Sequence, residues 1–382
     1  MKKSYKYIVL AGLLILGVAM AFVVARYAGT EVSQSDKVYV AAEDGGEVDV
    51  IDAKSRLVTK RIDLTIKQAD KSVMYMAHNV QVAPDGKSVW VTANAMSGEH
   101  TGFLHRLKNI LMPTAYADTG HGEESVAKDQ LIVIDPQTDT ITKRIDIGTN
   151  LHLAHVVLTP DSRYAIAVAQ EKGEIYKVDV VSYQVAQTVK TRQGDEPHGL
   201  RIAPDGKNVY IAMMGGKSIG RLDLETASLS YVPLDGKPVQ TGITSDGKYA
   251  LATVFDSKSV AVYNVFDKQL NYVTLPTEAK GPLQLYPTPD AKYAYVADQG
   301  NYFSQPDGDT LYKVDLEQLK VVEAIKVGTA PHGVVVSPDG KFVYVTNLVS
   351  NDVSVVDATT NKEVARISTG AKPNGISYWV KK

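Results

Sequence analysis

Short apolar runs recur along residues 37–380, and no helical period separates them. One kind of run ends in Asp or Asn and occurs seven times, at residues 48–52, 131–135, 175–179, 219–223, 260–264, 311–315 and 353–357. A second, aromatic-rich kind begins with Lys or Arg and also occurs seven times, at residues 37–40, 87–91, 163–167, 207–211, 248–252, 292–296 and 341–345. Six of the second kind follow a turn tripeptide such as Pro84-Asp85-Gly86.

Each period therefore predicts four antiparallel strands: an apolar strand A, the turn, an aromatic strand B, a strand C ending in Asp or Asn, and a strand D. Four strands in about 40–50 residues are typical of one β-propeller blade. The chain starts at a strand B (residues 37–40) and ends at a strand A (residues 373–380). We expect an all-β, seven-bladed propeller over residues 37–380, with one blade completed by both termini so that no edge stays free.

Tyr344-Val345-Thr346-Asn347, preceded by Ala330-Pro331-His332-Gly333 and the turn at 338–340, resembles the YVTN class of seven-bladed propellers. The resemblance covers residues 36–380. This class is similar to the haem-binding propeller of cytochrome-type nitrite reductases and to maturation proteins for their d-type haem, and it includes exported proteins and some lactonases. Pro-His-Gly recurs in that class as part of the repeat itself.

Histidines gather at one register position of strand A, which is the innermost strand of a blade. Six residues before the turn, the chain has His78, Ala154, His198, Val239, Leu283 and His332, and Asn374 takes the equivalent place in the last strand. His155 is one residue out of register, so it misses this ring unless a bulge or a shorter turn absorbs the offset. The ring is expected to be polar from His332 round to His198 and apolar at Val239 and Leu283.

Converging imidazoles suit copper, zinc or iron, or the axial positions of a haem-type tetrapyrrole. The candidate metal ligands are His78, His155, His198 and His332, and an ion would reach only ring neighbours, with His332 and His78 as the first pair. Candidate cofactor-binding residues are His78, His198, His332, Asn374 and Arg201, whose guanidinium in an apolar strand A requires a carboxylate or an anionic ligand. The alternative is that the histidines are repeat residues bonded to backbone, and that a carboxylate of the next blade pairs with Arg201.

An insertion at residues 95–129 separates strands B and C of one blade, on the face that carries the histidines. Phe103, Leu107 and Ile110 follow a helical spacing that Pro113 ends. The segment is expected to form either a lid over the ligand face or a surface helix packed on its own blade.

The N-terminus predicts export. Residues 7–25 are uncharged and follow Lys2, Lys3 and Lys6. Their length favours a signal anchor over a cleaved signal peptide, and the basic flank places the rest of the chain outside the cytoplasm. We expect a signal anchor or signal peptide at 1–26, a linker at 27–36, and a periplasmic or extracellular propeller tethered to the cytoplasmic membrane.

Composition narrows the function. The 382 residues contain 41 Lys and Arg against 43 Asp and Glu, and this charge balance argues against nucleic-acid binding. The sequence has no cysteine, which excludes disulfides, thiolate metal sites and covalent c-type haem. No nucleophile or acid–base pair is identifiable, so an enzymatic function is disfavoured. The leading hypothesis is a module that binds a protein partner or small ligand through its histidine-bearing face. The alternatives are a metal- or tetrapyrrole-binding redox or cofactor-maturation protein and a lactonase-like hydrolase.

Overall fold

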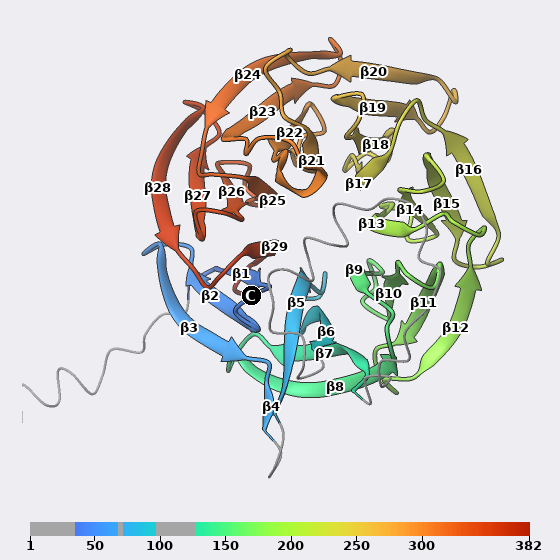
Figure 1. Ribbon diagram of the computed structural model, residues 1–382, viewed down its shortest axis with the longest axis vertical. Coiled ribbons are helices and arrows are strands. Elements are labelled where there is room, and N and C mark those ends of the chain that lie inside the picture. The colour runs from blue at the N-terminus through green and yellow to red at the C-terminus, as the bar shows by residue number, and fades with distance from the viewer. Residues whose placement is uncertain (1–34, 68–71, 97–126) are drawn as a thin grey trace, which may run out of the picture. The chain divides into compact units, whose positions relative to one another are not determined.

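The computed structural model describes residues 35–67, 72–96 and 127–382, and residues 36–380 with Lys382 form one compact unit. Seven antiparallel sheets are arranged around a central axis (Figure 1). Each has four strands, except the one that contains the short additional strand β4. The expected seven-bladed propeller is therefore confirmed.

The first two sheets contain the strands from the start of the chain. One is formed by β29 (Pro373–Trp379), β1 (Lys37–Ala42), β2 (Glu47–Asp52) and β3 (Leu57–Asp63). The next is formed by β4 (Ile66–Lys67), β5 (Ser72–Val82), β6 (Val89–Met96), β7 (Asp129–Asp135) and β8 (Thr140–Gly148).

The other five sheets follow in chain order. Two of them consist of β9 (Leu153–Leu158), β10 (Tyr164–Ala169), β11 (Glu174–Asp179) and β12 (Val185–Lys190), and of β13 (Pro197–Ile202), β14 (Asn208–Met213), β15 (Ser218–Asp223) and β16 (Leu229–Pro233). The next two consist of β17 (Pro238–Ile243), β18 (Tyr249–Val254), β19 (Ser259–Asn264) and β20 (Leu270–Thr274), and of β21 (Pro282–Pro287), β22 (Tyr293–Asp298), β23 (Thr310–Asp315) and β24 (Lys320–Lys326). The last consists of β25 (Pro331–Val336), β26 (Phe342–Asn347), β27 (Asp352–Asp357) and β28 (Lys362–Ser368). A 3-10 helix, η1 (Asn301–Phe303), lies between β22 and β23.

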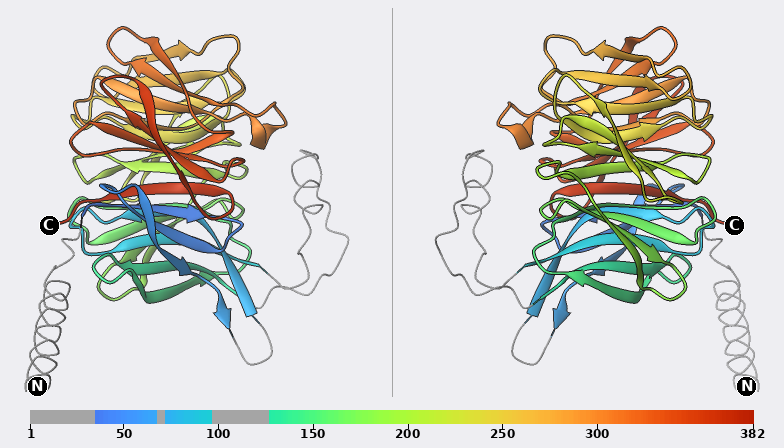
Figure 2. Two further views of the ribbon diagram at one scale, coloured as in Figure 1. Left: turned by 90° about the vertical axis from the view of Figure 1, so that its left-hand side faces the viewer. Right: turned by 90° about the vertical axis from the view of Figure 1, so that its right-hand side faces the viewer.

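Both termini complete one blade, as the sequence predicts. β29 pairs with β1 from Lys37 opposite Trp379 to Ala42 opposite Pro373. The inner strands contact one another in the order β5, β9, β13, β17, β21, β25 and β29, and β29 contacts β5 again. The inner ring is therefore continuous, and the side views show the sheets stacked around it (Figure 2).

The hydrophobic core lies between neighbouring sheets. Val168 and Ile175 of one sheet, for example, pack with Leu200, Ile211 and Leu222 of the next in one buried cluster. Strand B contributes fully buried tyrosines to such clusters, among them Tyr39, Tyr210, Tyr295 and Tyr344. Burial of both faces explains why the inner strands read as nearly continuous apolar runs rather than alternating ones.

Every inner strand carries a β-bulge at the ring position. In β9, Leu153 is opposite Ala169 and Val156 is opposite Ala167, so Ala154 and His155 together face one residue. The same register shift occurs in the inner strands of the other six sheets. A bulge bends the strand and redirects its side chains, so the side chains of two successive residues can both point toward the channel.

Several expectations concern residues outside the described part. Residues 1–34 contain the predicted signal segment and nearly all of the linker, and residues 97–126 contain the predicted helix of the insertion. Among the residues that the structure describes, no helix has the length and apolarity to span a membrane. The ends of the insertion belong to strands, since Ala95 and Met96 continue β6 and Asp129 begins β7.

Candidate metal site in the central channel

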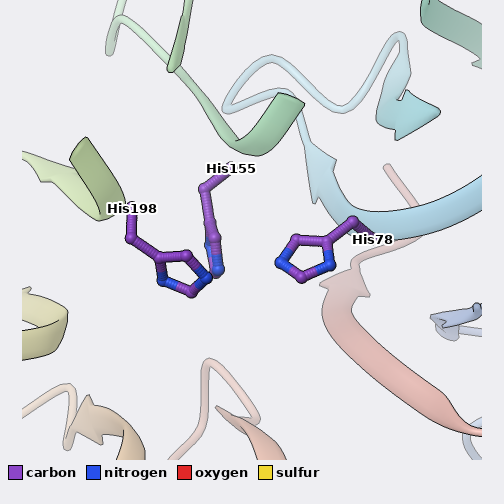
Figure 3. Close-up of side chains that lie close together, drawn as sticks. All are labelled: His78, His155 and His198. Carbon is purple, nitrogen blue, oxygen red and sulfur yellow. The ribbon is translucent and has the colours of Figure 1, made fainter. Parts of the chain in front are cut away.

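Histidines from three neighbouring inner strands converge at one end of the channel. His78 comes from β5, His155 from β9 and His198 from β13. Their ring centroids are 5.7 Å apart for His78 and His155, 5.6 Å for His78 and His198, and 5.1 Å for His155 and His198. One ligand nitrogen from each of the three lies within 4.8 Å of the other two (Figure 3). We call these three residues the histidine trio.

His155 joins the trio because of the bulge. It lies five residues before its turn proline, whereas His78 and His198 lie six residues before theirs. The bulge in β9 contains both Ala154, at the ring position, and His155, so the residue next to the ring position can also turn toward the other two histidines. Its side chain is fully buried, and neither ring nitrogen has a hydrogen-bond partner. Burial, followed by the charges of His198, His78 and Arg201, holds the pKa of His155 well below its usual value.

Backbone geometry fixes the proton of His198. Its Nδ1 lies 2.9 Å from the carbonyl oxygen of Val239 on β17. A carbonyl only accepts, so Nδ1 carries the hydrogen and Nε2 of the neutral ring keeps a free lone pair. Burial lowers the pKa of His198 to about 3. The ring is therefore neutral at physiological pH and has the tautomer that a metal ligand needs.

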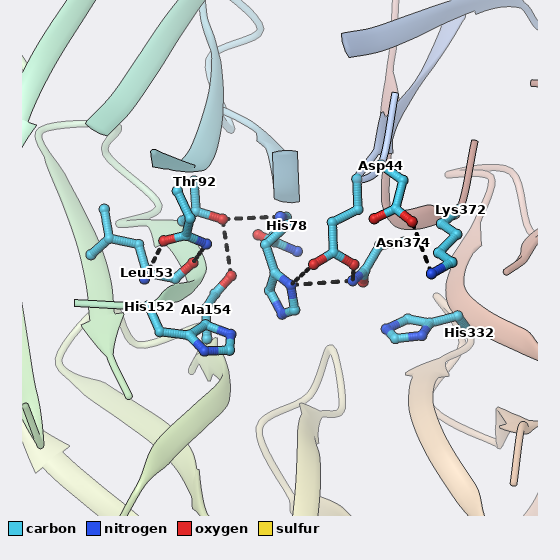
Figure 4. A network of polar contacts seen from close by, with 12 residues as sticks. Asp44, His78, Thr92, His152, Leu153, Ala154, His332, Lys372 and Asn374 are labelled. Atoms are coloured by element: carbon cyan, nitrogen blue, oxygen red, sulfur yellow. Dashed lines mark hydrogen bonds and ion pairs between the residues drawn. The ribbon is translucent and has the colours of Figure 1, made fainter. Parts of the chain in front are cut away.

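His78 is held from the other side by a carboxylate and an amide. Its Nδ1 lies 3.6 Å from Oε1 of Glu43 and 3.2 Å from Nδ2 of Asn374, and this amide also donates to Oε2 of Glu43 at 3.1 Å (Figure 4). Tyr302 donates its hydroxyl to the same Oε2 at 3.2 Å. The Nε2 atom of His78 is buried and has no partner. The Asn374 amide donates to Nδ1 of His78, so Nε2 of the neutral ring carries the hydrogen. For Nε2 to bind an ion, this proton has to move to Nδ1, and the Glu43 carboxylate has to come within hydrogen-bond distance to accept it.

His332 occupies the ring but lies outside the trio. Its Nδ1 is 2.7 Å from Nε2 of Gln299, and the edge of its ring meets Tyr302 with the centroids 5.3 Å apart. Asn374 is fully buried beside His78. On the opposite arc, Val239 and Leu283 pack with Phe255, so the ring has the polar and apolar arcs that the sequence predicts.

Arg201 lies three residues before its turn, further along the channel. One guanidinium nitrogen donates to the carbonyl of Leu200 at 2.9 Å, and the guanidinium carbon lies 5.7 Å from the ring centroid of Tyr286. Within the described part of the chain, no carboxylate lies within ion-pair distance of Arg201. Burial lowers the pKa of the guanidinium. The positive charge of Arg201 therefore has no carboxylate counterion among the described residues.

Glu43, Gln299 and His152 are site residues that the sequence reasoning did not select. Glu43 follows β1 in a B–C loop, and B–C loops lie on the histidine-bearing face, so this position could have identified it as a site residue. His152 meets His78 edge to face at a centroid distance of 5.5 Å, but its side chain is 41% exposed and lies 4.0 Å from Glu171. Gln299 follows β22 in the equivalent B–C loop, so the same position could have identified it, although spacing does not show that its partner is His332 in the next blade.

The trio has the composition of a transition-metal site. Three imidazole nitrogens suit zinc or copper better than a hard cation such as calcium, which prefers oxygen. In the described part of the chain, this is the one group of three or more ligand-type side chains whose ligand atoms converge. Its buried, unpartnered nitrogens are unusual for a structural role, because buried polar atoms normally have partners.

Comparison with known proteins supports the propeller fold described above. An uncharacterized protein of Staphylococcus epidermidis is 26% identical over 230 residues, which cover 54% of this chain and 63% of that protein. The structure of Kuenenia stuttgartiensis hydrazine synthase aligns with a TM-score of 0.62 at 18% identity, covering 79% of this chain and 89% of that one. Virginiamycin B lyase from Staphylococcus aureus aligns with a TM-score of 0.59 at 13% identity, covering 81% and 95% of the two chains.

The matched part of this chain thus spans less than two thirds of the Staphylococcus epidermidis protein. The structural likenesses are below 25% identity and concern the fold alone. The model of the YNCE-like β-propeller family matches residues 124–381, which is more than half of the chain. With the seven blades and their closure by both termini, this match shows that the chain belongs to the YNCE-like β-propeller family.

Proposed function

We propose that this protein is an exported propeller that binds one transition-metal ion, copper or zinc, through His78, His155 and His198. The observation that carries the proposal is the convergence of three buried imidazoles, with one ligand nitrogen of each within 4.8 Å of the others. The sequence predicts a ligand-binding face that carries histidines, and we now name the ligand as a metal ion and the three histidines that bind it.

The unpartnered nitrogens support an ion over a purely structural cluster. Nε2 of His78 and both ring nitrogens of His155 are buried without a partner. Each buried polar atom left without a hydrogen bond costs about 1–3 kcal/mol. An ion that binds one nitrogen of each ring offsets part of that cost, because the lone pair that binds it gains a strong partner, whereas the second nitrogen of His155 remains an N–H.

The donor set favours zinc or copper with an open position. Zinc in catalytic proteins commonly has three protein ligands, and water or substrate takes the fourth place. The trio supplies three imidazoles, and the channel lies beside them. This arrangement allows a further small ligand to reach the ion.

A tetrapyrrole fits this geometry less well than a single ion. The three rings lie edge to face or tilted, with centroids 5.1–5.7 Å apart. A macrocycle bound through any one of them would have to occupy the space that the other two fill. The described residues offer no comparable observation in favour of lactone hydrolysis.

Residues 1–26 support a location outside the cytoplasm. The uncharged stretch at 7–25 and the basic residues before it have the pattern of a signal anchor or signal peptide. We therefore assign metal binding to the periplasm or the cell exterior, with the propeller tethered to the cytoplasmic membrane.

Titration calorimetry on the full-length, chelator-stripped protein in detergent tests the proposal. Zn²⁺ and Cu²⁺ are each expected to bind with a stoichiometry of one, and His155→Ala and His198→Ala are each expected to remove high-affinity binding. His332→Phe is the matched control, because it alters another buried histidine of the same ring that lies outside the trio. Absence of binding to the unaltered protein, or an equal loss in the control, would overturn the proposal.

A further inference from the structure

His332 is fixed as a hydrogen-bond donor. The Oε1 atom of Gln299 accepts the backbone N–H of Tyr302 at 3.2 Å, which orients the Gln299 amide. Its Nε2 therefore faces Nδ1 of His332, at 2.7 Å, and donates to it. A neutral imidazole whose Nδ1 accepts must carry its hydrogen on Nε2.

The Nε2–H of His332 has no acceptor among the residues that the structure describes. This atom is buried without a partner, and the whole residue is only 1% exposed. Burial, followed by the charge of His78, holds the pKa of His332 well below its usual value, so the ring is neutral. A buried, oriented donor without an acceptor is costly, and a bound ligand that accepts its hydrogen would offset that cost.

The donor belongs to the same end of the channel as the trio. His332 takes the ring position of β25, two inner strands before β5, and Asn374 of the intervening β29 contacts His78 directly. Figure 4 shows His332 near Asn374 on the side of His78 that lies away from His152.

The charges of the channel favour an anion there. Glu43 is the carboxylate beside His78, and Arg201 adds a cation that pairs with no carboxylate among the described residues. With a divalent ion bound, positive charge exceeds negative charge in this part of the channel.

From these contacts we propose that a small oxyanion binds at the open position of the metal ion and accepts a hydrogen bond from Nε2 of His332. This inference rests on the proposed metal site and names the ligand class of that site. It gives His332 a role distinct from that of the trio: it contacts the ligand, and the trio contacts the ion. One oxygen of the anion binds the metal ion, and another oxygen accepts the hydrogen bond from Nε2 of His332.

Formate binding to the Cu²⁺-loaded, full-length protein tests this inference. Formate is expected to shift the visible d–d band of copper with saturable dependence on concentration. Because a hydrogen bond to a charged group is strong, His332→Phe should weaken formate binding about 10- to 100-fold. The copper affinity of the variant, measured separately, should be unchanged.

Gln299→Met is a second variant, which leaves His332 in place but frees its proton to occupy either nitrogen. It should weaken formate binding less than His332→Phe does, again without loss of copper, and it decides the matter should His332→Phe fail to fold. Intact copper binding with unchanged formate affinity in the folded variants would overturn this inference alone. If the unaltered protein binds no copper, both the metal site and the oxyanion site are refuted.

Discussion

His198 and His332 occupy the same position in their inner strands, yet their Nδ1 atoms have partners of opposite character. Nδ1 of His198 faces the carbonyl oxygen of Val239 at 2.9 Å, and Nδ1 of His332 faces the amide nitrogen of Gln299 at 2.7 Å. The first ring therefore presents a lone pair at Nε2, and the second presents an N–H. Two copies of one repeat motif, Pro-His-Gly, thus gain different chemistry from their neighbours.

The first prediction concerns the carboxylate beside His78. When Nε2 of His78 binds an ion, its Nδ1 carries a proton, and Oε1 of Glu43, which lies 3.6 Å away, has to move closer to accept it. Removing such an outer partner typically weakens metal binding 10- to 100-fold. Glu43→Gln should therefore lower the affinity for Zn²⁺ by about that factor in a competition titration with a chromophoric chelator.

Asp44→Asn is the control for this change. Asp44 adjoins Glu43 in the chain but pairs with Lys372 at 2.8 Å instead of with a histidine (Figure 4). Its variant should bind Zn²⁺ as the unaltered protein does. Equal affinities for the Glu43 and Asp44 variants would show that Glu43 does not position His78.

The second prediction concerns closure of the ring. Deleting residues 373–382 removes β29, the innermost strand of a blade whose other strands are β1, β2 and β3. This leaves the edge of β1 unpaired and exposes Val38 and Val40, which are fully buried. We expect aggregation or loss of cooperative unfolding, measured by size-exclusion chromatography and differential scanning calorimetry.

Deleting only Lys381 and Lys382 should have little effect, because β29 ends at Trp379. In the intact chain, Trp379 also anchors the strand by donating its indole N–H to the carbonyl of Gly86 at 2.8 Å. A monomeric, equally stable protein lacking residues 373–382 would contradict the closure.

The third prediction concerns acid stability and the turns between strands A and B. Ser337 donates its hydroxyl to Oδ1 of Asp339 at 2.7 Å, and Thr159 does the same for Asp161 at 2.5 Å. These bonds hold the pKa of both carboxyl groups below the usual value. A lowered carboxyl pKa stabilises the fold above the pKa of the unfolded chain, about 4, and that contribution is lost as the pH falls through the lower, folded value.

The double variant Asp161→Asn and Asp339→Asn should therefore show a smaller drop in melting temperature between pH 5 and pH 2 than the unaltered protein. Thermal unfolding followed by circular dichroism at a series of pH values measures this slope. A slope as steep as that of the unaltered chain would show that other groups dominate the acid response.

The sequence predicts the blades well because the repeat is local. Turn tripeptides such as Pro338-Asp339-Gly340 and the aromatic strand that follows are set by neighbouring residues, and seven repetitions reinforce one another. The ring position of His78, His198 and His332 follows from the same counting. These features need no knowledge of contacts between blades.

The different roles of the ring histidines depend on contacts between blades, which the repeat does not encode. The sequence groups His332 with His78, but the structure brings His155 to His78 and His198 through a bulge, and it pairs His332 with Gln299 from the preceding blade. Arg201 was expected to pair with a carboxylate of the adjoining blade, yet its described neighbours are Leu200 and Tyr286. Such pairings arise from tertiary packing, which spacing along one chain cannot specify.

X-ray absorption at the zinc edge of the Zn²⁺-loaded, full-length protein tests the metal site most directly, because it counts the imidazole ligands around the ion. We predict three imidazole nitrogens at about 2.0–2.1 Å in the unaltered protein and in His332→Phe. In His155→Ala we predict at most two. A spectrum with no imidazole scattering, or one that loses a ligand in His332→Phe but not in His155→Ala, would contradict the assignment of His78, His155 and His198 as the metal ligands.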